Sequence, residues 1–429
     1  MDILLRFTVE NFRSIGGSKT IIFVPSAIKD APDNNVAQCG AVRYLKTAAI
    51  YGANSSGKSN LIRALAVMRH IVRSSVKIND KDTLPYEPFA LSATDTPRLT
   101  KYEVDFITDS IHFIYGFSND EHRICEEWLT RIEPNGKETR LFIRTLEGIG
   151  INENIFAEGK DLEERTNDNR LFISLVGQLG GKISNAVITF FSMGLNVISG
   201  LDTDSYRIHS EVVLSQNKPV CANMKDFFRR IQLGFSDIAA VEHEFDASDI
   251  PSDVPKELKA KLLKDFSGKK QIKVFSTHGI YDNEGRLVAS RSFDFNEMES
   301  AGTQKIFDLA GPIFDTLSHG SILVVDELDA KMHPLISQEI VSLFNDPERN
   351  TKGAQLIFTT HDTNLLSARL LRRDQIWFTE KDEQERTDLY NIMQIVLPDG
   401  TKPRGDGNIE RNYIRGRYGA IPYIQTAID

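Results

Sequence analysis

The chain has 429 residues, which is enough to bury a large core without disulfide or metal support. Hydrophobic residues make up 41% and charged residues 26%, so the composition excludes a disordered chain and a fibrous protein. The net charge of -9 argues against a surface that coats nucleic acid all over, although a local basic groove would not show in this sum.

Three cysteines, Cys39, Cys125 and Cys221, lie more than eighty residues apart, so they indicate neither a disulfide framework nor a CxxC metal motif. A reducing, cytoplasmic setting is the natural expectation. Charged residues interrupt the first ten positions, and the apolar-leaning stretch 188–201 contains Thr, Ser, Asn and Gly. We therefore expect neither an export signal nor a transmembrane helix.

The N-terminal part of the chain predicts strands, one Gly-rich loop and one helix. Residues 4–9 and 20–24 have the pattern of two short strands. A strand at 47–51 runs into a Gly-rich loop, and apolar residues at helical spacing follow from Gly57. Alternation over 101–117, around a polar turn, predicts an antiparallel hairpin.

The rest of the chain predicts helices first and buried strands later. Residues 161–266 show mostly helical spacing, which predicts an inserted helical lobe. A hairpin is expected over 272–295, and continuous apolar runs that alternate with helical patterns follow it at 322–325, 356–358 and 375–378.

These patterns predict an α/β fold with a mainly parallel core sheet, an antiparallel β subdomain and an inserted helical lobe. We expect residues 1–150 to hold the P-loop part and the β subdomain, 151–270 to form the helical lobe, and 271–429 to complete the core.

A phosphate-binding motif lies between the strand at 47–51 and the next helix. It fits the P-loop pattern GxxxxGK[ST] and consists of Gly52, Ala53, Asn54, Ser55, Ser56, Gly57, Lys58 and Ser59. Backbone N–H groups of such a loop cradle phosphates, Lys58 neutralises the β- and γ-phosphate charge, and the Ser59 hydroxyl is a Mg²⁺ ligand. The motif predicts ATP and Mg²⁺ as cofactors, and the choice between ATP and GTP stays open.

Two acids close the apolar strand at 322–325. Acids at the carboxyl end of a parallel strand face the crevice where ligands bind. Asp326 is expected to orient Mg²⁺, and Glu327 is placed to polarise the attacking water. In a chain without a P-loop, the same pair would more often be an ordinary strand end.

The motifs are far apart and follow a definite order. Lys58 and Asp326 are 268 residues apart, so a large piece of structure must be inserted between them. The segment 299–304 precedes the two acids, and Leu328-Asp329 and Thr359-Thr-His361 follow them. This order resembles the signature, Walker B, D-loop and switch histidine of ABC-type ATPases.

Four segments together resemble one bacterial family of stand-alone ABC-type ATPases. They are Asn11-Phe-Arg-Ser14, the P-loop, the Asp-Glu-Leu-Asp-Ala-x-x-His-Pro run over 326–334, and the Tyr-Ile-Arg-Gly-Arg-Tyr-Gly-Ala-Ile-Pro run over 413–422. The family is often labelled AAA family ATP-binding proteins or ATP/GTP phosphatases and includes RloA-like and abortive-infection ATPases. The resemblance spans nearly the whole chain and implies an ABC-type P-loop ATPase head, related to the heads of SMC, RecF and OLD proteins.

The resemblance also implies roles in a dimer whose two heads sandwich two nucleotides. Ser300 and Gly302 would contact the γ-phosphate held by the other subunit, Asp329 would act across the interface, and His361 would sense the γ-phosphate. The signature here reads Ser-Ala-Gly-Thr rather than Ser-Gly-Gly-Gln. Without the motif order, Ser300 would be read as a helix N-cap and His361 as a strand-end histidine.

Three further features have mainly structural interpretations. His333 precedes a proline that suits the first position of a helix, so we expect a structural role. For Arg13 the resemblance implies a phosphate contact, and an ordinary surface position in a turn is an equal alternative. The basic and aromatic tail over 402–417, with Tyr423 beyond it, suits a packed C-terminus, and contact with a phosphate backbone or a protein is the other interpretation.

The leading interpretation is a Mg²⁺-dependent ATPase that works as a dimerising switch in bacterial anti-phage defence or DNA maintenance. Its expected partners are a second copy of the chain, or a higher homo-oligomer, and a separate nuclease or toxin-like effector, with DNA or RNA contact also open. Only 68 residues follow His361, too few for an OLD-type nuclease domain. The alternative is a RecF/SMC-like DNA-binding repair ATPase. A transporter motor fits less well, because the Walker motifs are far apart and no membrane segment is expected.

Overall fold

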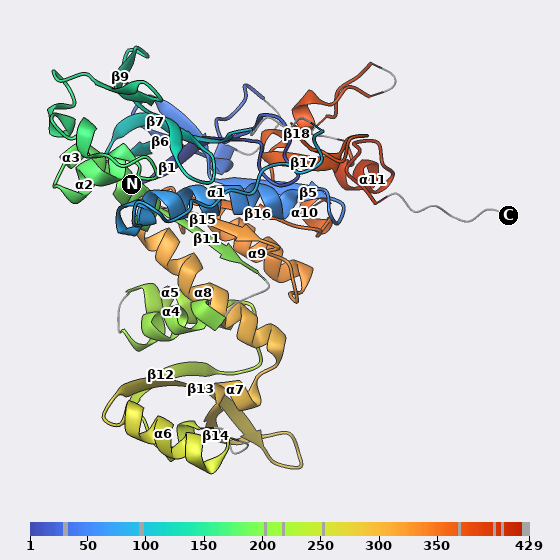
Figure 1. The fold of residues 1–429 in the computed structure, drawn as a ribbon. Helices are drawn as coiled ribbons and strands as arrows, with labels where there is room; N and C mark the ends of the chain where they lie inside the picture. Colours follow the sequence, from blue (N-terminus) through green and yellow to red (C-terminus); the bar gives the residue numbers. More distant parts are fainter. Residues whose placement is uncertain are drawn as a thin grey trace. The chain divides into compact units, whose positions relative to one another are not determined.

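The computed structural model describes residues 1–28, 33–93, 98–200, 204–216, 219–250, 254–367, 370–397, 400–404 and 407–422. The chain forms two compact units (Figure 1). The first unit comprises residues 1–201 and 319–429, and the second comprises 202–318. Among the described residues, no helix is both long and apolar enough to cross a membrane.

A six-stranded sheet forms the centre of the first unit. Its strands, in spatial order, are β11 Leu195–Ser199, β15 Ile322–Asp326, β16 Gln355–Thr359, β5 Thr47–Gly52, β17 Ile376–Lys381 and β18 Thr387–Asn391. The first five are parallel, and β18 pairs antiparallel with β17. Every residue of β5 and β16 is buried, which explains their continuous apolar sequences. The mainly parallel core sheet is therefore confirmed.

Four described helices of the first unit follow strands of this sheet along the chain. They are α1 Lys58–Ser74, α9 Pro334–Asn345, α10 Asn364–Ser367 and α11 Ile409–Ile414. The apolar residues of α1 recur at helical spacing, and α1 contacts strands of both large sheets of the unit. Helix α9 packs against β16 and β5.

A seven-stranded antiparallel sheet is the β subdomain that the alternating sequences predict. Its spatial order is β10 Gly148–Ile151, β9 Glu138–Thr145, β8 Ile124–Ile132, β7 Ile111–Asn119, β6 Thr100–Thr108, β1 Ile3–Glu10 and β2 Lys19–Ile22. The predicted hairpin is β6 and β7, with Asp109 and Ser110 both at positive φ in its turn. The smaller elements of this unit are β3 Val36–Cys39, β4 Val42–Leu45, α2 Phe172–Gln178 and α3 Lys182–Thr189.

One hydrophobic core joins the two large sheets. Side chains of β1, β6 and β7 cluster with those of α1, β5 and β15. Phe156, Phe172 and Phe190 belong to the same cluster. Residues 151–200 are therefore part of the first unit, so the unit boundaries differ from the predicted lobe at 151–270.

The second unit combines helices with a small sheet. Its helices are α4 Asp204–Ser215, α5 Pro219–Arg230, α6 Lys256–Phe266, α7 Phe295–Met298 and α8 Ala301–His319, whose last residue is counted with the first unit. The sheet has the order β12 Asp237–Glu244, β13 Lys270–Tyr281 and β14 Leu287–Asp294. The predicted hairpin over 272–295 corresponds to β13 and β14, whereas β12 was not predicted, because its alternation is weak and most of its residues are exposed.

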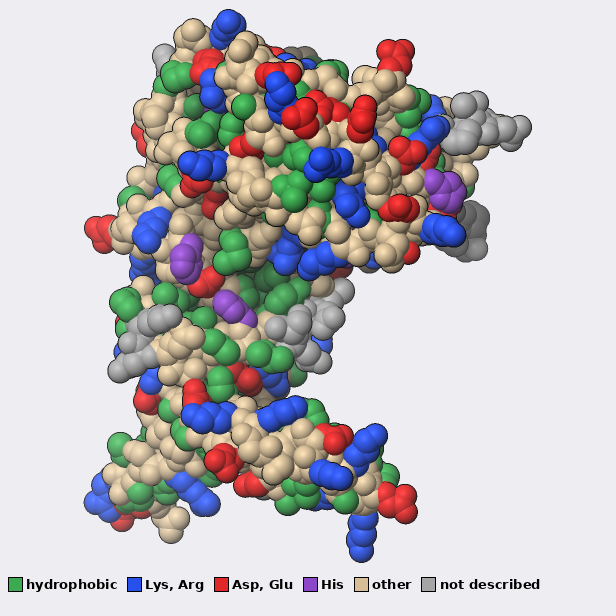
Figure 2. All heavy atoms as spheres, turned by 60° about the vertical axis from the view of Figure 1, so that its left-hand side comes forward, with side chains coloured by type: hydrophobic (Ala, Val, Ile, Leu, Met, Phe, Trp, Pro, Cys, Tyr) green, Lys and Arg blue, Asp and Glu red, His purple; other side chains and the backbone are tan. Residues whose placement is uncertain are grey.

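On the face of the molecule drawn in Figure 2, Lys and Arg side chains are interspersed with Asp and Glu side chains. This mixture agrees with the modest net charge of the whole chain.

Candidate functional site

The P-loop connects the central strand β5 to helix α1, as the sequence predicts. Ser55 (φ 64°) and Gly57 (φ 108°) have left-handed backbones, which wrap the loop around the start of the helix. A β-carbon on Gly57 would lie 2.0 Å from the Thr387 hydroxyl oxygen, so only glycine fits at this point.

Strands β17 and β18 hold the loop from outside. The Ser56 hydroxyl shares a hydrogen bond of 2.7 Å with the Thr379 hydroxyl, and the Thr387 hydroxyl donates to the Ser56 carbonyl oxygen at 3.0 Å. These contacts fix the shape of the loop before any ligand binds, which lowers the cost of ordering it.

Lys58 is a buried cation that has no carboxylate partner among the described residues. Its side chain is only 5% exposed, and its ammonium donates to the carbonyl oxygens of Gly52 (2.8 Å) and Ala53 (3.1 Å). Within the described part of the chain, no salt bridge of 4.0 Å or less reaches this ammonium. Burial lowers its pKa, and the charges of Glu327 and Asp326 act in the opposite direction. An anionic ligand would supply the missing charge.

The two acids predicted to form Walker B lie at the end of β15. Asp326 is the last residue of the strand, and Glu327 follows with a left-handed backbone, φ 56°. The Thr359 hydroxyl donates to Asp326 Oδ1 at 2.6 Å and accepts a hydrogen bond from the Glu327 backbone N–H at 2.7 Å. The Gly200 N–H donates to the Asp326 carbonyl oxygen at 2.6 Å. Both acids are therefore held by neighbouring strands.

His361 and Asp329 meet after β16. The His361 backbone N–H lies 3.3 Å from Asp329 Oδ2, so the carboxylate of the predicted D-loop steadies the predicted switch segment. The imidazole keeps a solvent-exposed edge, yet partial burial, followed by the nearby Lys58 charge, lowers its pKa below the ordinary 6.5. The neighbouring carboxylates, Asp329 first, oppose this shift.

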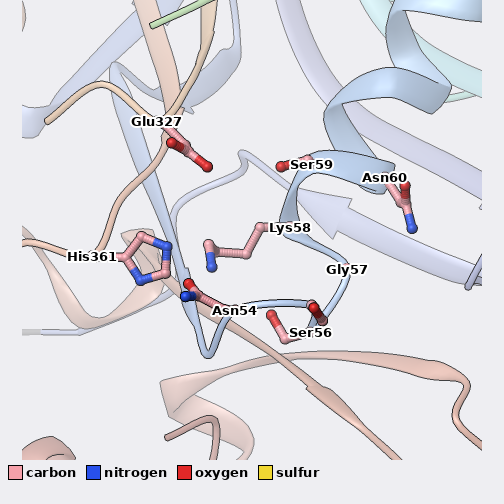
Figure 3. A pocket seen from close by; sticks show the side chains of 9 residues that line it. Asn54, Ser56, Gly57, Lys58, Ser59, Asn60, Glu327 and His361 are labelled. Carbon is pink, nitrogen blue, oxygen red and sulfur yellow. The ribbon is translucent and has the colours of Figure 1, made fainter. Parts of the chain in front are cut away.

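These elements surround a cavity of about 460 Å³. Figure 3 shows the Lys58 side chain between the P-loop and the side chains of Glu327 and His361. The lining residues are Asn54, Ser55, Ser56, Gly57, Lys58, Ser59, Asn60, Glu327 and His361. The structure therefore brings the predicted P-loop, the second Walker B acid and the switch histidine to one cavity.

The donors around this cavity fit Mg²⁺ bound together with a polyphosphate. The Ser59 hydroxyl and the Asp326 carboxylate are hard oxygen donors, which Mg²⁺ prefers. Among the described residues, no group of three or more His, Cys, Asp or Glu side chains could hold a metal ion. Mg²⁺ that is bound with a polyphosphate commonly needs only one or two protein donors, because phosphates and water supply its other ligands.

Ser300 and Gly302 belong to the second unit, whereas the P-loop, the two acids, Asp329 and His361 belong to the first. Ser300 is exposed and caps α8, where its hydroxyl accepts from the Thr303 N–H at 3.2 Å. Their role in a composite nucleotide site stays a prediction.

The other singled-out residues have local partners. His333 caps α9, with Nδ1 accepting from the Leu335 N–H at 3.2 Å, which confirms its structural role. Arg13 pairs with Glu87, Nε to Oε2 2.5 Å. In the C-terminal tail, Tyr413 is buried against Tyr51, and Tyr423 lies outside the described residues.

Asn60 and Gly200, and the contacts that Thr359 makes with the two acids, are features of the site that sequence reasoning missed. Asn60 lines the cavity, and its amide donates to the Ser14 hydroxyl at 2.7 Å. Asn60 lies next to the P-loop in the sequence and Thr359 begins the predicted switch segment, but neither position indicated these contacts. Gly200 and Thr359 act on β15 from strands distant in the sequence.

A family model described as "AAA domain, putative AbiEii toxin, Type IV TA system" matches residues 48–367. The matched range contains the P-loop, both Walker B acids and His361. A search of curated proteins found no match.

Solved structures of SMC heads resemble the chain at low identity. The SMC head domain from Thermotoga maritima has a TM-score of 0.42 and 15% identity, covering 91% of this chain and 98% of that one. An SMC head bound to the C-terminal winged-helix domain of ScpA has a TM-score of 0.45 and 14% identity, covering 90% and 97%. An SMC head domain with an extended coiled coil, bound to the C-terminal domain of ScpA and derived from Pyrococcus furiosus, has a TM-score of 0.39 and 12% identity. The match covers 91% of this chain and 96% of that one.

Proposed function

The chain belongs to the AAA domain family whose description reads putative AbiEii toxin, type IV TA system, and we propose that its P-loop cavity binds Mg-ATP and hydrolyses it. Membership confirms the resemblance to AAA family ATP-binding proteins. One observation carries the proposal: Lys58 is buried in the cavity with two carbonyl oxygens as hydrogen-bond partners and no carboxylate partner among the described residues. A triphosphate supplies the anionic charge that this ammonium lacks.

The chain's own residues have distinct tasks in this proposal. The P-loop N–H groups and Lys58 bind the phosphates, and Ser59 and Asp326 are the residues that would hold Mg²⁺. Bound Mg²⁺ neutralises phosphate charge during phosphoryl transfer. Glu327 accepts a proton from the attacking water, because its carboxylate lines the cavity beside the metal-binding acid. His361 lies on the cavity wall, where it can contact the γ-phosphate.

Hydrolysis in this proposal accompanies dimer formation. Ser300 and Gly302 of one chain complete the nucleotide site of a second chain, and Asp329 acts across the interface. The exposure of Ser300 at the start of α8 supports this assignment, since a residue that reaches another subunit must be accessible. ATP then closes two heads, and hydrolysis opens them.

We further propose that the switch serves bacterial defence in the cytoplasm with a separate effector protein. The family description, which includes a toxin of a toxin–antitoxin system, supports a defence role. The effector is expected to respond to the open or closed state of the dimer.

The test compares Glu327→Gln with Glu348→Gln, a matched loss of one carboxylate at an exposed position outside the cavity. Glu327→Gln should keep Mg-ATP binding and slow phosphate release by at least about 100-fold, because an amide cannot accept the proton. Glu348→Gln should match the unaltered protein. Equal turnover in both variants would contradict the assignment of Glu327 as the base.

A further inference from the structure

We propose that Thr359 is a positioning residue that sets the geometry of both Walker B acids through a single hydroxyl group. This inference rests on the proposed ATP hydrolysis. It concerns a residue that does not line the cavity and therefore acts through Asp326 and Glu327 rather than on the nucleotide.

The Thr359 hydroxyl has one partner as a hydrogen-bond donor and another as an acceptor. Thr359 ends β16 and is fully buried. Its hydrogen goes to Asp326 Oδ1 at 2.6 Å, and its oxygen accepts the Glu327 N–H at 2.7 Å. The carbonyl oxygen of the same residue accepts the Leu328 N–H at 3.1 Å. Three consecutive residues, the last of β15 and the two that follow it, are thus tied to one residue of the neighbouring strand.

These bonds determine where the two carboxylates point. Because Asp326 Oδ1 accepts the hydrogen bond from the hydroxyl, the carboxylate cannot rotate freely. Glu327 has a left-handed backbone, φ 56°, which a residue with a β-carbon adopts reluctantly. The hydrogen bond to its N–H stabilises this conformation and with it the direction of the side chain.

Thr47 serves as a control for a hydroxyl with a purely structural role. It makes hydrogen bonds of the same kinds as Thr359, but away from the two acids. Thr47 is 1% exposed and begins the adjacent strand β5, where it pairs with Leu356, while Ile50 pairs with Thr359. Its hydroxyl donates to Asn345 Oδ1 at 3.1 Å and accepts from Gln375 Nε2 at 2.6 Å. The two threonines are therefore alike in burial and in hydrogen bonding. They differ in position, because Thr47 lies at the start of its strand and Thr359 lies at the end of its strand.

The experiment measures ATP hydrolysis and ATP affinity for Thr359→Val, Thr359→Ser and the control Thr47→Val. Affinity is measured by calorimetry with Mg²⁺ and again with EDTA. Thr359→Val should lower kcat by about 10- to 100-fold, the range expected for losing hydrogen bonds at charged groups. It should also reduce the gain in ATP affinity that Mg²⁺ provides, while affinity in EDTA stays within about threefold, because the P-loop is untouched.

The two other variants separate positioning from folding. Thr359→Ser keeps the hydroxyl and should restore kcat and the Mg²⁺ effect to within about threefold of the unaltered protein. Thr47→Val should lower the melting temperature without changing either quantity. If Thr359→Val does not fold, Thr359→Cys replaces it, because a thiol is of similar size but forms only weak hydrogen bonds. Thr359→Cys should lower kcat and the Mg²⁺ effect on affinity to a smaller extent, and affinity in EDTA should again stay nearly unchanged.

The inference is overturned if Thr359→Val hydrolyses ATP like Thr47→Val and keeps the full Mg²⁺ effect on affinity. That result is distinct from failure of the proposed function, in which the unaltered protein itself does not hydrolyse ATP. In that case the affinity ratio with and without Mg²⁺ still tests Thr359, since it requires no turnover.

Discussion

Gly200→Ala should impair catalysis without changing a residue of the cavity. Gly200 follows β11, and a β-carbon there would lie 2.1 Å from the carbonyl oxygen of Glu327 and 2.9 Å from that of Asp326. Ordinary contact begins at 3.4 Å, so the Gly200 backbone and the peptide after Glu327 must move apart by more than 1 Å. These contacts are with backbone, which cannot rotate away as a flexible side chain could.

The expected loss of activity follows from this displacement. Misplacing a catalytic group by about 1 Å costs on the order of 100-fold in rate. Overpacking of this kind also costs about 1–3 kcal/mol of stability. We therefore expect kcat to fall by about 100-fold, while ATP affinity in EDTA, which depends on the P-loop, changes by less than about threefold.

The matched control is Gly17→Ala, in which the added methyl group meets no atom within 4 Å. Steady-state phosphate release, calorimetry in EDTA and thermal unfolding should be measured for both variants. If Gly200→Ala hydrolyses ATP as fast as Gly17→Ala, then the Glu327 peptide tolerates displacement and our account of how the acid is positioned is wrong.

Two other predictions concern assembly and pH. Lys58→Ala and Ser300→Arg should each be inactive as homodimers, yet a mixture should recover part of the ATPase activity, since one composite site is then intact; mixed dimers that form and stay inactive would contradict a signature acting in trans. Burial raises the pKa of Glu211 from 4.5 to about 7, with Arg207 opposing and Asp308 adding to the shift. The folded state therefore binds this proton more tightly, and the stabilisation is lost as pH rises from 4.5 through about 7. Glu211→Gln should flatten the fall in melting temperature over this window, and an unchanged profile would exclude Glu211 as its source.

The nucleotide motifs were predictable from sequence because each is local. The P-loop is a continuous run over 52–59, and its strand–loop–helix context is visible in the flanking hydrophobic pattern. Asp326 and Glu327 close an apolar run of typical strand length. The structure places these motifs at the ends of β5 and β15, two strands of one sheet that are separated by β16.

The contacts that hold the motifs were not predictable, because they depend on which strands become neighbours. Thr359 and Gly200 reach Asp326 only because β15 lies between β11 and β16. The boundary of the inserted lobe was misplaced for a similar reason. Phe156, Phe172 and Phe190 lie within the predicted lobe at 151–270, yet they are buried in the core of the first unit.

Calorimetric titration of Mg-ATP into Lys58→Met and Lys46→Met tests the central claim most directly. Both lysines are at most 5% exposed, and the Lys46 ammonium donates to the Asn345 carbonyl oxygen at 2.8 Å, outside the cavity. If the cavity is the nucleotide site, Lys58→Met should lose at least about 10-fold in ATP affinity, and Lys46→Met should bind like the unaltered protein. Equal ATP affinity for the two variants would contradict the assignment of this cavity as the ATP site.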